Sequence, residues 1–173
     1  MRIWAARIGQ RHSKSARMES ERCKEGERMN KRAFRLLIIE DDDARIVQFK
    51  SWVPPDVRIV VASSAGTALG ILQRDRGTVY GGMLLDHDLQ KRTVTQMGKS
   101  LSGTQIIDSI IVSISSDVPV LIHSMNSSGS AVMMARLVEE GFSVTRISME
   151  NLNKELFIKW LEEARELWED SVE

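Results

Sequence analysis

Two short runs of consecutive apolar residues, each ending in carboxylates, constrain this chain most. Residues 36–39 lead directly into Glu40 and Asp41, and residues 83–85 lead into Asp86. Apolar residues that are consecutive rather than alternating are typical of strands buried on both faces of a parallel sheet. Ligands of open α/β sheets bind at the rim where such strands end, so these acids are predicted to stand at a binding rim.

The rest of the folded part alternates further strands with segments that carry apolar residues at helical spacing. Five strands are predicted, at residues 33–39, 57–61, 81–89, 118–122 and 142–147. Five helices are predicted at residues 44–53, from 63 or 64 to about 75, from 103 onward, between 127 and 141, and over 151–168. Such alternation gives a parallel sheet with right-handed crossovers and helices on both faces.

The predicted fold class is therefore α/β, a doubly wound five-stranded parallel sheet of the flavodoxin-like order 2-1-3-4-5. The fifth strand has a more alternating pattern, so we place it at an edge.

At finer detail, Asp43 is predicted to cap the first helix. The fourth helix is predicted to bury four apolar residues, Val132, Ala135, Leu137 and Val138.

Charge divides the chain into two predicted parts, a disordered basic tail at residues 1–32 and a domain at residues 33–170. The tail holds ten Lys/Arg against four Glu, whereas the remainder holds fourteen Lys/Arg against twenty Asp/Glu. The tail also lacks apolar periodicity, and Met18 and Met29 are alternative starts. A mildly acidic domain is not expected to bind nucleic acid in general. With Cys23 as the one cysteine and no membrane-length apolar run, we expect a cytoplasmic protein.

In the predicted strand order, the acids that follow the first and third strands converge at the switch point. Glu40, Asp41, Asp86 and Asp88 are therefore the candidate metal ligands. Carboxylates that share one site repel each other unless a cation neutralises them. A hard cation with oxygen ligands, Mg²⁺ or Mn²⁺, is the predicted cofactor.

Ser124 and Asn126 follow the fourth strand and are the candidate phosphate-binding residues. The serine hydroxyl and the amide can donate hydrogen bonds to phosphate oxygens. A helix begins directly after them, and helix N-termini favour anions. The site is therefore interpreted as a place for a metal and a phosphate.

His87 and His123 are the two histidines of the folded part, and each stands at a strand end on the same rim. Together with Asp86 they are the candidate catalytic residues, because an acid–base pair of near-neutral pKa can hydrolyse a cyclic phosphodiester. An alternative stays open for His123. If the pleat turns it into the sheet, it is a packing residue and Ser124 is the site residue.

These residues resemble the receiver domains of two-component response regulators. Glu40 and Asp41 look like that family's acidic pair, Asp86 like its phosphoacceptor, and Ser124 like its serine or threonine on the fourth strand. The resemblance implies Mg²⁺ binding and phosphorylation of Asp86.

A closer resemblance is to the cyclic-phosphate-processing receiver domains. It rests on Leu-Asp-His-Asp-Leu at residues 85–89, Ser-Gly at 102–103, His-Ser-Met-Asn at 123–126 and the downstream Gly129. It implies metal-dependent hydrolysis of cyclic phosphates on nucleotides or RNA ends. The acidic motif after the first strand and the long loop at 90–102 depart from that pattern.

Three functional hypotheses follow. The first is the cyclic phosphodiesterase. The second is a stand-alone receiver phosphorylated on Asp86, although the strand-five lysine of receivers is missing and Thr145 or Arg146 stands near its place. The third is a non-catalytic pseudo-receiver that binds a protein partner through the last helix and the fifth strand. The partners expected are a phosphate-bearing small molecule or RNA end and a protein, with no membrane and no DNA-binding domain.

Overall fold

The protein is described from a computed structural model, which covers residues 33–87, 89 and 103–172. The predicted tail at 1–32, the predicted ligand Asp88 and the predicted loop at 90–102 lie outside the described residues. The described part contains one five-stranded parallel sheet in the order β2-β1-β3-β4-β5. The predicted α/β fold class and strand order are confirmed, and β5 lies at an edge as expected.

The strands are short and the helices vary in length. The strands are β1 Arg35–Ile39, β2 Arg58–Ala62, β3 Gly82–Asp86, β4 Val120–Ser124 and β5 Val144–Ser148. The helices are α2 Asp43–Trp52, α3 Ala65–Arg74, α5 Gly103–Ser113, α6 Ser127–Glu139 and α7 Lys154–Val172.

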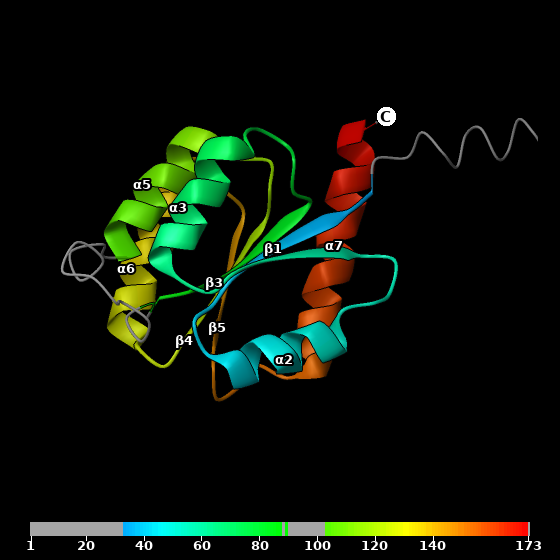
Figure 1. Cartoon of the computed structure of the whole chain (residues 1–173), viewed down its shortest axis with the longest axis horizontal. Helices are drawn as coiled ribbons and strands as arrows, with labels where there is room; N and C mark the ends of the chain where they lie inside the picture. Colours follow the sequence, from blue (N-terminus) through cyan, green and yellow to red (C-terminus); the bar gives the residue numbers. More distant parts are fainter. Residues whose placement is uncertain (1–32, 88, 90–102, 173) are drawn as a thin grey trace, which may run out of the picture. The chain divides into compact units, whose positions relative to one another are not determined.

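Side chains that alternate along the central strands supply two apolar cores, one on each face of the sheet. On β1, Leu37 and Ile39 join the core beneath α3, α5 and α6, whereas Leu36 and Ile38 join the core beneath α2 and α7. Figure 1 shows these two groups of helices on opposite sides of the sheet. Burial on both faces explains why these strands are continuous apolar runs.

The cap of α2 is one residue earlier than predicted. Asp42 has an extended backbone, and its Oδ1 accepts hydrogen bonds from the backbone N–H groups of Ala44 and Arg45 at 3.0 and 3.2 Å. Asp43 is already the first helical residue, so the prediction that it caps the helix was wrong. Consecutive acids leave the cap ambiguous because any of them can accept these bonds.

The buried stripe of α6 also differs from the prediction. Ser130, Met133 and Leu137 are the buried residues of this helix. The other three residues predicted to be buried are exposed: Val132, Ala135 and Val138. Ser130, Met133 and Leu137 are separated by three and four residues, which is the helical spacing, whereas Leu137 lies five and two residues from Val132 and Ala135. The prediction passed over the stripe that includes a serine.

Helix α7 packs one face on the sheet and leaves the other in solvent. Its buried residues include Trp160, Ala164 and Trp168, while Leu156 and Leu167 are 38% and 49% exposed. Among the described residues, no helix has both the length and the apolar character needed to cross a membrane.

His123 is a member of the core. The pleat of β4 turns it toward α2 and α7, where its ring centroid lies 5.0 Å from that of Phe49 and none of its surface is exposed. Neither ring nitrogen has a hydrogen-bond partner among the described residues. Burial, together with the nearby charge of Arg45, lowers the pKa of His123 to about 3.

The burial of His123 predicts a loss of stability in mild acid. The ordinary pKa is 6.5 and the folded value is about 3, so between these values only the unfolded chain takes up the proton. This contribution to stability is complete above pH 6.5 and is lost as the pH falls, by about 2 kcal/mol at pH 5.

We therefore expect the change in unfolding free energy between pH 7 and pH 5 to be smaller in His123→Phe than in the wild type, by about 2 kcal/mol. Urea unfolding at both pH values measures it. Asp117→Asn, at an exposed site, serves as the control. An equal pH dependence in His123→Phe and the wild type would contradict the assignment of a neutral core imidazole.

Candidate functional site

Strands β1 and β3 bring three acids to one edge of the sheet. Glu40 and Asp41 directly follow β1, and Asp86 is the last residue of β3, its neighbour in the sheet. The three residues are 0%, 2% and 2% exposed, and one carboxylate oxygen from each lies within 4.8 Å of the others. The predicted convergence of these acids is observed, while Asp88 lies outside the described residues.

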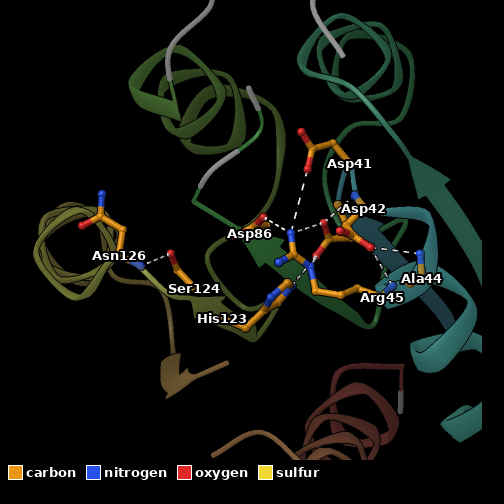
Figure 2. Close-up of polar contacts among 9 residues, drawn as sticks. Asp41, Asp42, Ala44, Arg45, Asp86, His123, Ser124 and Asn126 are labelled. Atoms are coloured by element: carbon orange, nitrogen blue, oxygen red, sulfur yellow. Dashed lines mark hydrogen bonds and ion pairs between the residues drawn. The ribbon is translucent and has the colours of Figure 1, made fainter. Parts of the chain in front are cut away.

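Arg45, in the first turn of α2, extends its guanidinium among the three carboxylates (Figure 2). Its Nε donates to Glu40 Oε2 at 2.8 Å, and its Nη2 donates to Glu40 Oε1 at 2.8 Å and to Asp86 Oδ2 at 3.0 Å. The same Nη2 lies 3.9 Å from Asp41 Oδ1. Among the described residues, Arg45 is thus the cation that contacts all three acids.

The surroundings of Arg45 keep it charged. Burial acts to lower the pKa of Arg45, but the hydrogen bond and charge of Glu40 and the charge of Asp86 raise it. Glu40 is itself held in place, because its Oε1 also accepts the backbone N–H of Asp42 at 2.8 Å. Sequence reasoning missed the role of Arg45. Its position four residues after Asp41 indicates a local ion pair but does not indicate the contact with Asp86.

The donor set fits a divalent cation. Counting only the described residues, one guanidinium and three carboxylates at formal charge leave two negative charges in this buried pocket. All three acids are oxygen donors, and their closest oxygens are near enough for one ion to contact several of them. Glu40, Asp41 and Asp86 would hold Mg²⁺ or Mn²⁺; this role stays a prediction.

Ser124 and Asn126 stand at the end of β4, the strand next to β3. Ser124 is 5% exposed, and its Oγ accepts the backbone N–H of Asn126 at 2.9 Å (Figure 2). The side-chain oxygen of Asn126 caps α6 by accepting the backbone N–H of Gly129 at 2.9 Å. This cap uses the amide oxygen of Asn126 and leaves its N–H groups, so the Ser124 hydroxyl and the Asn126 amide both stay candidates for a phosphate oxygen.

The structure does not bring His87 and His123 together as a pair. The imidazole of His87 lies over Gly129 in α6, so close that a Cβ at Gly129 would be 2.1 Å from its Nε2. His123 faces the opposite core, and its Nε2 lies 3.8 Å from Glu40 Oε2. This geometry favours the alternative in which His123 packs, and its catalytic role is an untested prediction.

Arg146 on β5 lies close to Ser124 and to the start of α6. Its Nη1 donates to the backbone oxygen of Ser127 at 2.9 Å and to Ser130 Oγ at 3.3 Å. With Ser124, it lines a polar depression of about 430 Å³ between α6 and the end of β5. Arg146, which stands near the place where receiver domains have a lysine, is therefore hydrogen-bonded to α6.

Comparison with protein-family models and with curated proteins finds no match. Solved structures do match. A CheY-like response regulator receiver domain from Methanospirillum hungatei JF-1 is 17% identical, with a TM-score of 0.58 over 79% of this chain and 98% of that one.

Two further matches agree. The signal receiver domain of a LuxO repressor protein from Vibrio parahaemolyticus is 19% identical, with a TM-score of 0.57 over 80% of this chain and 96% of that one. The response regulator domain of Thermotoga maritima CheB is 16% identical, with a TM-score of 0.54 over 79% and 96%. At such identities the likeness concerns the fold, and it shows that this chain has the CheY-like fold of receiver domains.

Proposed function

We propose that this domain accepts a phosphoryl group on Asp86, assisted by a divalent cation that Glu40, Asp41 and Asp86 hold. The observation that carries the proposal is the position of Asp86. It ends the central strand of a receiver fold, is 2% exposed, and shares its pocket with two further buried carboxylates. Strand ends at a switch point are where open α/β sheets bind ligands.

The proposed reaction transfers a phosphoryl group from a small phosphodonor. An Asp86 carboxylate oxygen forms a bond to phosphorus, and the bond from phosphorus to the leaving group breaks, with its electron pair going to the leaving group. A bound divalent cation supplies positive charge against the phosphoryl oxygens. Ser124 supports this step, because its Oγ accepts from Asn126 and its own proton remains for donation.

Hydrolysis of a cyclic phosphate on a nucleotide or RNA end is the second candidate. The observation that favours it is the imidazole of His87, which directly follows Asp86 and lies over the start of α6. As a base, His87 would take a proton from water; the water oxygen would bond to phosphorus, and one ring P–O bond would break with protonation of the released oxygen. It ranks second because a buried His123 of pKa about 3 is not charged at neutral pH and has no acid proton to give.

The proposal also includes a protein partner, which would bind at α7 and β5 and receive the signal from the domain. Within the described residues, β5 pairs with β4 alone, which leaves its other side for a partner. Without metal binding or phosphorylation, the domain would be left with this interaction role.

The phosphoacceptor assignment predicts one phosphoryl adduct after incubation with acetyl phosphate and Mg²⁺. Intact-mass spectrometry should show it in the wild type, with stability in acid and loss in base. Asp86→Asn and EDTA should each abolish it. Asp117→Asn, which removes an exposed acid at the other end of β4, should leave it intact. An adduct that persists in Asp86→Asn, or none in the wild type with metal present, would refute the assignment.

The second candidate predicts that the protein hydrolyses a 2′,3′-cyclic nucleotide in the presence of Mn²⁺. Chromatography of substrate and product measures the rate. His87→Ala should reduce the rate about 100-fold or more if the imidazole is the base. Gly129→Ala should also lower it, because the added Cβ displaces His87.

Gly66→Ala is the matched control, since a Cβ there meets nothing within 4 Å and the rate should not change. No turnover by the wild type, or full turnover by His87→Ala, would eliminate this candidate.

A further inference from the structure

We infer that Arg45 is a built-in competitor of the divalent cation, so that its guanidinium sets the metal affinity of the pocket. The inference rests on the proposed metal site and deepens it. It begins with position: Nη2 of Arg45 lies 2.8 Å from Glu40, 3.9 Å from Asp41 and 3.0 Å from Asp86. These are the same three carboxylates whose oxygens cluster within 4.8 Å.

A single nitrogen that reaches all three carboxylates occupies the volume in which one ion would contact them together. A guanidinium is always charged in proteins, so it does not vacate the site by losing a proton. Two cations among the same oxygens repel each other strongly at low effective dielectric constant. Metal entry therefore requires Nη2 to leave Asp86 and Asp41.

Arg45 is more exposed than the three acids that it contacts. Its side chain is 19% exposed, whereas those of Glu40 and Asp86 are 0% and 2% exposed. Glu40 is bound in a two-point contact through Nε and Nη2, and the Nε bond can persist while Nη2 moves. Asp86 is bound at one point, through Nη2 alone of the Arg45 nitrogens. The contacts of Nη2 with Asp86 and Asp41 are therefore the ones that metal entry would break.

The same contacts make Arg45 a substitute for the metal when none is bound. Three buried carboxylates without a counter-charge repel one another, and removal of a partner from a buried charge cluster is destabilising. Arg45 thus stabilises the metal-free fold and weakens metal binding through one set of contacts. A neutral residue at this position reverses both effects.

The test compares wild type, Arg45→Gln and Arg45→Lys for binding of Mg²⁺ or Mn²⁺ by calorimetry. Arg45→Gln should bind on the order of tenfold more tightly, because the competing charge is gone. Arg45→Lys keeps the charge without the two-point contact and should fall between the other two. Arg74→Gln removes an exposed guanidinium that pairs with Asp75, which keeps Tyr80 and Arg35 as partners, and this variant should match the wild type.

Thermal unfolding with EDTA and with metal gives a second readout. Arg45→Gln should be less stable than the wild type in EDTA and should gain more from added metal, while Arg74→Gln should show neither effect. Arg45→Lys keeps this readout usable if Arg45→Gln does not fold, because it should show the same pattern to a smaller extent.

The outcomes separate the two claims. Metal binding by the wild type with equal or weaker binding by Arg45→Gln overturns the competition and leaves the metal site standing. Binding by Arg45→Gln that exceeds wild-type binding supports both. If neither wild type nor variants bind either ion, the metal site itself is refuted, and the competition with it.

Discussion

Repulsion among three buried carboxylates is the constraint around which the functional edge of this domain is built. Glu40, Asp41 and Asp86 come from two neighbouring strands, and parallel pairing leaves them no room to separate. Burial strengthens their mutual repulsion, so the fold needs a positive charge at this point. Arg45 supplies it from the first turn of α2, and its hydrogen bonds to two of the acids fix that turn to the sheet.

The alternation of side chains along the strands then decides which neighbouring groups can take part in chemistry. On β4, the pleat sends His123 into the core with Phe49, while Ser124, one residue later, lines the depression beside α6. His87 lies on the α6 side, over Gly129. A hydroxyl and one imidazole, rather than two imidazoles, therefore accompany the acids. This division favours phosphoryl acceptance over two-histidine hydrolysis.

The sheet order and the meeting of the acids followed from sequence, because consecutive apolar runs and βα alternation leave few parallel topologies. Details that depend on which of two neighbouring residues takes a position could not be predicted from the sequence. Asp42 rather than Asp43 caps α2, and Met133 rather than Val132 faces the core, because neighbouring residues of similar chemistry satisfy the same pattern. Arg45 was missed for another reason: its role arises from a partner 41 positions away, Asp86, which no local spacing reveals.

The most direct test of the account is Mn²⁺ titration monitored by NMR, in which the paramagnetic ion broadens the resonances of nearby amides. We expect the earliest broadening at Asp41 and Asp86 together, with loss of this pattern in Asp86→Ala. Broadening confined to exposed acids such as those of α7, with the amides of Asp41 and Asp86 unaffected, would contradict a shared cation site at the ends of β1 and β3.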